Sequence, residues 1–207
     1  MHYLKYIIFS VKKKFLLFYL FIFHNNFYRI LAIDSHLTIL ERYKLYTTAK
    51  SKQIIAEIGS YIGASACCFG AAVKANGTGK IICIDTWNND SMSEGNRDTF
   101  NEFQDNTREY MNYILPIRGF STDVIQAVRD VTQHLDVLFI DGDHSYEGVK
   151  ADWEAYKGLL KTGSVVVFHD SGWAEGVKRV IDEDVKEFVK SSDSLPNLWW
   201  GTISQMP

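Results

Sequence analysis

The chain has 207 residues and a formal net charge of −3, a length that suits one domain better than two and a mild acidity that argues against nucleic acid as a partner. Apolar residue types make up 46% and charged types 23%, with only three prolines, so a disordered or collagen-like chain is excluded. The three cysteines are too few for a disulfide framework, which favours a cytoplasmic protein with reduced thiols.

The first 33 residues differ in charge from the rest. They hold five basic side chains and no acidic one, whereas residues 34–207 have a net charge of −8. Their longest uninterrupted apolar run, residues 15–23, is far shorter than the roughly 20 residues that a membrane-spanning helix needs. We therefore predict an N-terminal extension, residues 1–33, ahead of a folded domain at residues 34–207. The extension fits a peripheral membrane anchor, a helix packed on the domain, a disordered leader or, although no small-x-small cleavage site follows it, a secretory signal.

Helical and strand-like segments alternate from residue 34 onward. Thr38 and Glu41 have the spacing of a capping box, which predicts a helix from there to about residue 50. Short strands separated by helices imply parallel pairing, so the predicted fold is a doubly wound, mostly parallel α/β sheet. Apolar, β-branched runs predict strands at residues 53–58, 80–84, 114–117, 135–140, 164–168 and 198–203, and helical spacing predicts helices at 64–75, between 98 and 113, and at 124–131, 146–160 and 174–189.

A glycine loop follows the first predicted strand, at the edge where such sheets bind ligands. Gly59 and Gly63 are four residues apart, unlike the glycines of a G-x-G-x-x-G dinucleotide motif, and Glu57 precedes them. A glutamate at this point disfavours a pyrophosphate and favours a ligand with a cationic end. We expect Gly59 to allow a sharp turn and Gly63 to let the backbone approach a ligand. The same string also fits a plain strand-to-helix turn.

Asp85 ends the second predicted strand. A carboxylate at this point of the fold can accept hydrogen bonds from both hydroxyls of a ribose, and Trp87 can stack on an attached adenine. The alternative is a capping aspartate beside a packed tryptophan.

Two further aspartates follow the strands predicted at 135–140 and 164–168. Because these strands are expected to be neighbours, the carboxylates of Asp141 and Asp170 can converge on one divalent cation, and oxygen ligands favour Mg²⁺. His169 is a candidate nitrogen ligand, and His144 is placed to act as a base on a metal-bound hydroxyl. Alternatively, Asp170 caps the next helix and His144 is an exposed turn residue.

Together these segments resemble the class I S-adenosylmethionine-dependent methyltransferases, in particular the small bacterial branch that includes macrocin and rhamnosyl O-methyltransferases. The resemblance covers residues 37–180 and rests on IAEIGSYIGAS, IDTWNND, FIDGDHSYEGVKADW and VVVFHDSG, in that order. It implies a Rossmann-like fold, with the methionine part of the cofactor at the glycine loop, the ribose at Asp85 and the adenine edge near Ser121. His169 departs from the family, where this position is often acidic. The cofactor-binding residues so implied are Glu57, Gly59, Ser60, Tyr61, Gly63, Ser65, Asp85, Thr86, Trp87, Ser121 and Asp141.

The predicted function is S-adenosylmethionine-dependent O-methylation of a small molecule or sugar hydroxyl, with Mg²⁺ on Asp141, His169 and Asp170 and with His144 as base. Residues 88–113 are expected to form a lid over the acceptor. Two other functions stay open: a nicotinamide-dependent oxidoreductase, and a non-catalytic, membrane-associated module that binds a nucleoside. The closing antiparallel hairpin of this fold has only one strand-like segment here, residues 198–203, and the uncovered edge predicts a homodimer.

Overall fold

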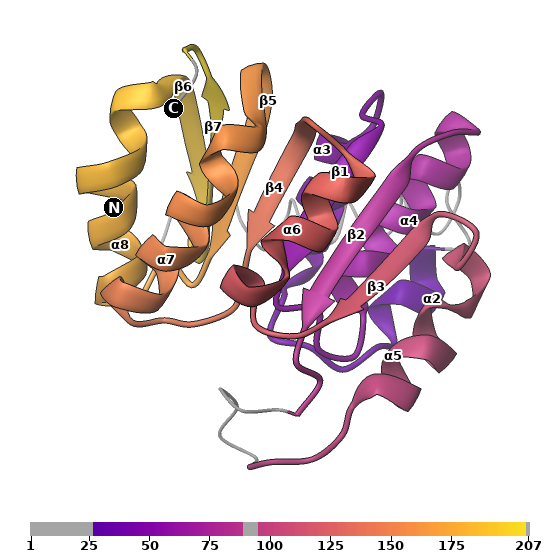
Figure 1. Cartoon of the computed structure of the whole chain (residues 1–207). Coiled ribbons are helices and arrows are strands. Elements are labelled where there is room, and N and C mark those ends of the chain that lie inside the picture. Colours follow the sequence, from indigo (N-terminus) through magenta and orange to yellow (C-terminus); the bar gives the residue numbers. More distant parts are fainter. Residues whose placement is uncertain (1–26, 89–94, 206–207) are drawn as a thin grey trace, which may run out of the picture.

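The structure, a computed structural model, describes residues 27–88 and 95–205. Its strands are β1 (Ile54–Ile58), β2 (Lys80–Asp85), β3 (Ile114–Arg118), β4 (Leu135–Ile140), β5 (Leu160–His169), β6 (Val189–Leu195) and β7 (Leu198–Ile203). They form one sheet in the order β3-β2-β1-β4-β5-β7-β6 (Figure 1). The first five strands of this order are parallel, and β7 is antiparallel to both of its neighbours. The predicted doubly wound α/β fold is confirmed.

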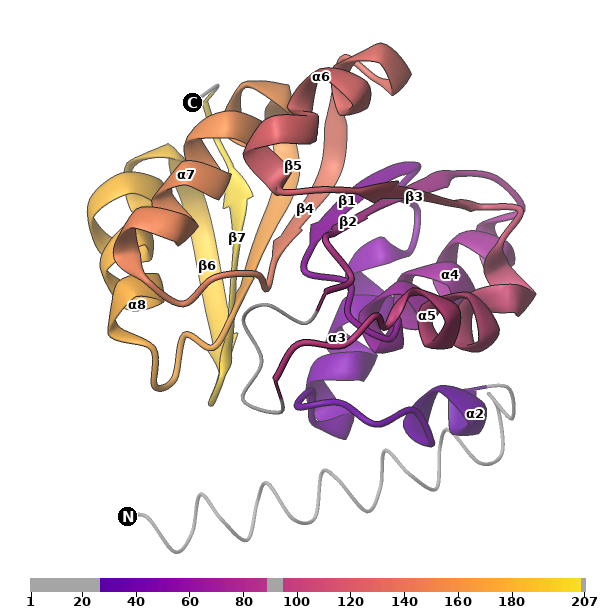
Figure 2. The same cartoon turned by 60° about the horizontal axis from the view of Figure 1, so that its bottom comes forward.

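Helices cover both faces of the sheet (Figure 2). One face carries α2 (Phe27–Leu31), α3 (Ile39–Ala49), α4 (Ala64–Asn76) and α5 (Phe100–Thr107), which continues as the 3-10 turn η1 (Arg108–Tyr110). The other face carries α6 (Ser121–Val131), α7 (Tyr146–Tyr156) with the 3-10 turn η2 (Lys157–Leu159), and α8 (Glu175–Val180). The helix predicted at 174–189 continues past α8 as a π-helical turn, η3 (Ile181–Val185), and a 3-10 turn, η4 (Lys186–Phe188).

Strand residues alternate between two separate apolar cores. Ile55 and Val137 lie in the core shared with α3 and α4, whereas Ala56 and Leu138 lie in the core shared with α7 and α8. All four side chains are fully buried. A parallel sheet that is covered on both faces buries both sets of side chains, which is why its strands read as continuous apolar runs in the sequence.

The predicted capping box at the start of α3 is confirmed. The Glu41 carboxylate accepts a hydrogen bond from the Thr38 amide at 2.7 Å, and the Thr38 hydroxyl accepts one from the Glu41 amide at 3.4 Å. Two amides that have no partner within the helix are thereby satisfied. The same pair fixes the position of Glu41, which is 1% exposed and reaches the functional site.

Part of the predicted extension belongs to the packed fold. Phe27 and Ile30 of α2 are buried, and the Arg42 guanidinium donates to the carbonyls of Ile30 at 2.6 Å and Ile33 at 2.9 Å. Residues 1–26, on which the anchor, leader and signal predictions fall, lie outside the described residues. Within residues 27–88 and 95–205, no helix combines the length and apolarity needed to cross a bilayer.

The sheet ends in the hairpin that the sequence analysis expected to be incomplete. Residues 189–195 form β6, which pairs with β7, so the expectation of a missing edge strand is wrong. Its sequence, VKSSDSL, is exposed at every inner position and has no apolar alternation that would reveal a strand. The uncovered β7 edge that predicted a homodimer is therefore occupied by the chain itself.

The segment expected to form a lid is packed against α4 from residue 100 onward. Phe103 and Thr107 of α5 are buried, and the Asn106 side chain donates to the Ile62 carbonyl at 2.8 Å. The lid prediction is wrong for α5 and η1, because Phe103, Thr107 and Tyr110 anchor this segment in the core. Residues 89–94 of the same segment lie outside the described residues.

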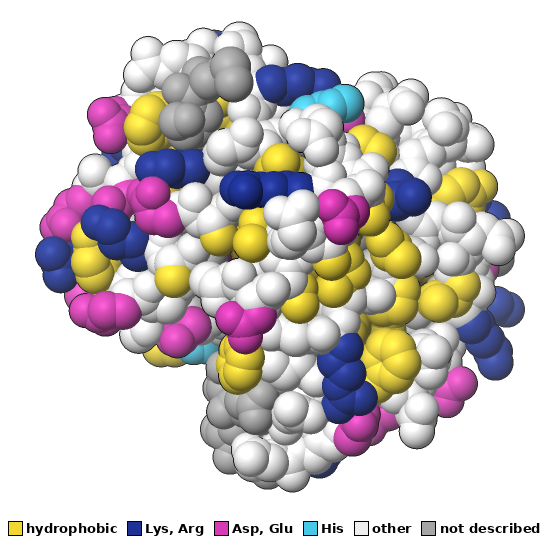
Figure 3. Space-filling model, viewed as in Figure 1, with side chains coloured by type: hydrophobic (Ala, Val, Ile, Leu, Met, Phe, Trp, Pro, Cys, Tyr) yellow, Lys and Arg dark blue, Asp and Glu magenta, His cyan; other side chains and the backbone are white. Residues whose placement is uncertain are grey.

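The strand β3 lies at the opposite edge of the sheet and is incompletely covered. Ile114 is buried, but the next three residues are only half-buried. Figure 3 shows hydrophobic side chains among charged ones at the surface in the region of β3 and α6. Partial cover explains why this strand has a weaker apolar pattern than β1, β2 or β4.

Candidate active site

A cavity of about 470 Å³ opens at the carboxyl edge of the parallel strands, the edge that comes forward in Figure 2. Its size is within the usual range for small-molecule sites, and its position is where open α/β sheets bind ligands. The wall consists of the segments that follow β1 to β5, residues of α6 and α7, residues 34–37 ahead of α3, and Thr99. Of the predicted site residues, Gly59, Ser60, Tyr61, Ser65, Asp85, Thr86, Ser121, Asp141, His144, His169 and Asp170 line it, whereas Glu57, Gly63 and Trp87 do not.

Gly59 allows the loops after β1 and β4 to touch. Its φ of +87° is in the left-handed region, and a Cβ atom there would lie 2.0 Å from the Asp141 carbonyl oxygen. The expected sharp turn is thus present at Gly59. Gly63 differs from the expectation, because it packs against α5 rather than against the cavity. A Cβ there would lie 2.7 Å from the Thr107 methyl group, with φ at +90°.

Glu57 lies behind the glycine loop and not in the cavity wall, which corrects its predicted direct contact with the methionine part. It is fully buried near Ser60, Ser65 and Cys83, and neither carboxylate oxygen accepts a hydrogen bond of ordinary geometry. Burial raises the pKa of this carboxyl to about 7. Ionisation of this side chain, which lies directly beneath the loop, is therefore unfavourable.

Asp85 is held rigidly at the end of β2. Its two carboxylate oxygens accept backbone hydrogen bonds, one from Tyr61 at 2.8 Å and one from Trp87 at 2.6 Å. Each oxygen keeps a second lone pair, so the carboxylate can still accept bonds from a ligand. The geometry fits the expected binding of a ribose diol.

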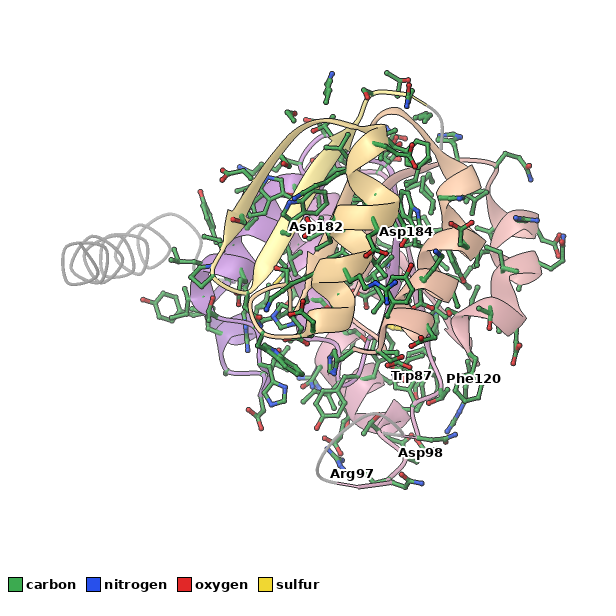
Figure 4. The ribbon with its side chains drawn as sticks, turned by 90° about the vertical axis from the view of Figure 1, so that its left-hand side faces the viewer. Trp87, Arg97, Asp98, Phe120, Asp182 and Asp184 are labelled. Atoms are coloured by element: carbon green, nitrogen blue, oxygen red, sulfur yellow. The ribbon has the colours of Figure 1, made fainter. Side chains whose placement is uncertain are left out.

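Trp87 does not stack on a ligand in the cavity, and this prediction is corrected. Its side chain is fully buried, its indole N–H donates to the Tyr61 carbonyl at 2.9 Å, and its ring contacts Phe100 and Phe103. Figure 4 shows Trp87 within the fold, above the outer segment that carries Arg97 and Asp98. Trp87 thus supports the backbone that holds Asp85, in agreement with the packed alternative.

Asp141, His144 and Asp170 form a cluster at the ends of β4 and β5. Each offers one ligand atom, and these atoms lie within 4.8 Å of one another. His144 Nε2 is 2.7 Å from an Asp170 oxygen. This bond raises the pKa of His144 above its ordinary value, against the opposing effect of burial. Two carboxylates and an imidazole form a donor set that fits a divalent cation.

His169 is a partner of the carboxylates instead of the predicted metal ligand. Its Nδ1 is 3.0 Å from Asp141 Oδ1 and 3.3 Å from Asp170 Oδ1, and its Nε2 is 3.9 Å from Glu41 Oε2. Burial lowers the pKa of the imidazole, but the carboxylates outweigh it and raise this pKa to about 12. An imidazolium has no free lone pair for a metal.

Asp170 is fixed by residues that the sequence analysis did not identify. The Trp173 indole N–H donates to Asp170 Oδ1 at 2.7 Å, and the Asn197 amide donates to the same oxygen at 2.8 Å. Burial alone would raise the pKa of Asp170, but hydrogen bonds from His144 and His169 hold it well below its usual range. No sequence pattern marked Asn197 as a site residue, since it lies in the turn before β7. Trp173 is itself 61% exposed.

Ser121 begins α6 at the β3 end of the cavity. Its hydroxyl donates to the Asp152 carboxylate, and the Tyr156 hydroxyl donates to its carbonyl at 3.0 Å. Asp152 lies in the motif FIDGDHSYEGVKADW but was not singled out by the sequence analysis. The cavity thus has one end at Asp85 and Ser121 and an acid–histidine end at Asp141 and Asp170.

The comparisons with known proteins agree with this geometry. Residues 56–171 match a family described as a methyltransferase domain. The uncharacterized protein y4gI of Sinorhizobium fredii is 30% identical over 119 residues. That match covers 56% of this chain but only 13% of the longer relative.

Several solved structures share the fold at low sequence identity. The O-methyltransferase NovP has a TM-score of 0.68 and 15% identity, covering 83% of this chain and 84% of that chain. CalS11, a TDP-rhamnose 3'-O-methyltransferase of calicheamicin biosynthesis, has a TM-score of 0.60 and 17% identity over 79% and 77%. TomG from Streptomyces achromogenes, solved with S-adenosylmethionine, has a TM-score of 0.58 and 16% identity over 81% of each chain. The chain therefore belongs to the methyltransferase-domain family, as its motifs predicted.

Proposed function

We propose that this protein transfers the methyl group of S-adenosylmethionine to a hydroxyl of a small molecule or sugar, and that Mg²⁺ assists the transfer. The observation that carries the proposal is the cluster of Asp141, His144 and Asp170 in the same cavity as Asp85. A cofactor bound at Asp85 would have its reactive end near a base and near two carboxylates suited to a cation. The O-methyltransferase structures with the same fold support the choice of oxygen as acceptor atom.

The cofactor would lie across the ends of the first three parallel strands. The backbone and hydroxyl groups from Gly59 to Ser65 would bind the methionine part, and Asp85 would accept hydrogen bonds from the ribose. Ser121 would lie beside the adenine at the end of β3. This arrangement leaves the end of the cavity at Asp141 and Asp170 for the acceptor.

His144 is the base in this proposal. Its Nε2 bonds to Asp170, and no described group makes a hydrogen bond to Nδ1, which can therefore take a proton. The bound cofactor would supply the methyl group and would leave as a neutral thioether, since the acceptor oxygen gains the bond to carbon that the sulfur loses. The hydroxyl proton passes to His144. Asp141 and Asp170 would hold Mg²⁺, which when bound lowers the pKa of the acceptor hydroxyl.

Calorimetry and a transfer assay test the proposal. We expect S-adenosylhomocysteine to bind the purified chain and NAD⁺ not to bind. Methyl transfer from radiolabelled S-adenosylmethionine to TDP-rhamnose or catechol should occur with Mg²⁺ and decrease with EDTA. Binding of NAD⁺ instead would favour the oxidoreductase. Cofactor binding without transfer to either acceptor would favour the non-catalytic module.

The predicted location and oligomeric state of the protein need separate experiments. Peripheral membrane contact through residues 1–33 predicts association with anionic vesicles that is lost when these residues are removed. A cytoplasmic location and a homodimer stay predictions, which cell fractionation and light scattering would check.

A further inference from the structure

Trp173 is a tryptophan whose ring the proposed function does not use. Its side chain is 61% exposed, whereas the other four tryptophans of the chain are buried or half-buried. Tryptophan is normally buried to a large extent, because its ring is the largest apolar surface that a side chain offers. Exposure alone identifies no site, but the contacts that hold this ring in place do.

The ring of Trp173 is held at the rim of the cavity by two lining residues. Its indole N–H donates to Asp170 Oδ1 at 2.7 Å, and its ring meets the His144 ring edge-to-face, with centroids 5.0 Å apart. Both Asp170 and His144 line the cavity. The exposed ring thus lies directly beside the proposed base, at the acid–histidine end where the acceptor would bind.

The backbone around Trp173 keeps the ring in this position. The Gly172 amide donates to Asn197 Oδ1 at 3.1 Å, and a Cβ atom at Gly172 would lie only 2.1 Å from the Pro196 carbonyl oxygen. The Trp173 amide donates to the Asp170 carbonyl at 3.2 Å. A ring that is already fixed loses little freedom when a ligand stacks on it, so more of the contact energy is left for binding.

The charges of the cavity wall limit which acceptors can reach this ring. Within the described residues, no lysine or arginine lines the cavity. Seven aspartates line it: Asp34, Asp85, Asp123, Asp141, Asp143, Asp152 and Asp170. The cationic cofactor, Mg²⁺ and the His169 imidazolium would together offset only part of this negative charge. A negatively charged acceptor would therefore be repelled, and a neutral or cationic one would not.

We propose that the ring of the acceptor stacks on Trp173 beside His144, and that this site takes a ring compound without negative charge. The inference deepens the proposed function and rests on it. Stacking on the indole would place a hydroxyl at the edge of the acceptor ring within reach of His144. An aromatic ring and the apolar face of a sugar ring share the chemistry that an indole binds. A nucleoside diphosphate sugar is excluded by its pyrophosphate, whereas the same sugar without the nucleotide is not.

Two variants of Trp173 separate stacking from the support of Asp170. Trp173→Ala and Trp173→Phe both remove the hydrogen bond to Asp170, but only Trp173→Phe keeps an aromatic ring at the rim. Isothermal titration measures the binding of catechol and of methyl rhamnoside to the full chain saturated with S-adenosylhomocysteine and Mg²⁺. We expect Trp173→Ala to bind the preferred ring about tenfold more weakly than wild type, and Trp173→Phe to stay within about threefold of wild type. In both variants the Kd for S-adenosylhomocysteine should change less than about twofold, because Asp85 and Ser121 lie at the other end of the cavity.

Two pairs of ligands test the exclusion of negative charge. 3,4-Dihydroxyphenylacetate is an anionic counterpart of catechol, and TDP-rhamnose is an anionic counterpart of methyl rhamnoside. In wild type each anionic compound should bind at least about tenfold more weakly than its neutral counterpart, and added salt should reduce that difference. The neutral compound that binds more tightly shows whether the acceptor ring is aromatic or a sugar.

Equal affinities of Trp173→Ala and Trp173→Phe for the preferred ring would overturn the inference, because the ring would then have no role beyond its hydrogen bond. So would anionic compounds that bind as tightly as their neutral counterparts, or a wild-type protein that binds neither neutral ring. These last two measurements need no variant that must fold. A wild-type protein that does not bind S-adenosylhomocysteine would instead contradict the proposed function.

Discussion

Glu57 makes the stability of the protein depend on pH, because its carboxyl has a raised pKa in the folded state. The pKa of this carboxyl is about 7 in the folded protein, against an ordinary value of 4.5, so the folded state binds its proton more tightly than the unfolded state does. The free energy of unfolding should therefore decrease as the pH rises from about 4.5 to about 7, and stay low above that. The cost of the buried charge is thus present at neutral and alkaline pH.

Glu57→Gln removes that charge and keeps the shape of the side chain. We expect it to be more stable than wild type by on the order of 3 kcal/mol at pH 8 and nearly equal to it at pH 4.5, measured by urea denaturation. Glu147→Gln, at an exposed position of α7, should change neither value. The same small difference at both pH values would show that the Glu57 charge is compensated.

His144 should matter for turnover and not for cofactor affinity. It is bonded to Asp170 at the acid–histidine end of the cavity, away from Asp85 and Ser121. We expect His144→Ala to lower the rate of methyl transfer by about 10²–10⁴ while the Kd for S-adenosylhomocysteine changes less than about twofold. His134→Ala is the exposed control. Unchanged turnover in His144→Ala would remove the residue from its role as base.

The sequence predicts which residues come near the site, because strand ends meet at one edge, but not the direction of each side chain. Glu57 and His169 are examples of residues whose position was predicted but whose side-chain direction was not. Glu57 shares a face of β1 with Ile55, and His169 shares a face of β5 with Val167, so both point toward the layer of α3 and α4. Strict alternation along the strand would have found this. Trp87 had no such signal, since it lies beyond the strand with a φ of +53°.

The turn from β1 to α4 can be tested with a pair of glycines. Gly59 and Gly77 both have positive φ, +87° and +76°, but a Cβ at Gly59 would collide with the Asp141 carbonyl and a Cβ at Gly77 would meet open space. We expect Gly77→Ala to cost about 1 kcal/mol, from backbone strain alone. Gly59→Ala should cost at least about 3 kcal/mol, because the loops after β1 and β4 must separate. Equal losses in chemical denaturation would mean that these loops move apart freely.

The buried strands were more predictable than the exposed ones. β1, β2 and β4 have apolar residues on both faces, so their composition alone indicates a covered parallel strand. β6 is a strand because β7 offers it a hydrogen-bonding edge, and no local preference of its polar residues reveals that. For the same reason Asn197, which the hairpin brings to Asp170, could not be found before the pairing of β6 and β7 was known.

The two ends of the cavity have different chemistry, and this division should be visible in the thermal stability of the protein. In the proposed function, the end at Asp85 and Ser121 binds a nucleoside and the end at Asp141 and Asp170 binds a cation. A ligand that binds only the folded state stabilises it, by about 2.7 kcal/mol at 100 times its Kd. For a chain of this length that corresponds to an increase in Tm of about 5–10 °C.

We therefore expect S-adenosylhomocysteine to raise the Tm in wild type and in Asp170→Asn alike. Mg²⁺ should raise it further in wild type but not in Asp170→Asn, because removing one charge of the pair weakens the attraction for a divalent cation. Differential scanning fluorimetry of each protein without ligand, with each ligand alone and with both gives the four values needed for that protein. If Mg²⁺ has no effect on wild type while S-adenosylhomocysteine does, the imidazolium of His169 already balances the aspartates. The acceptor hydroxyl would then lose its proton to His144 without help from a metal.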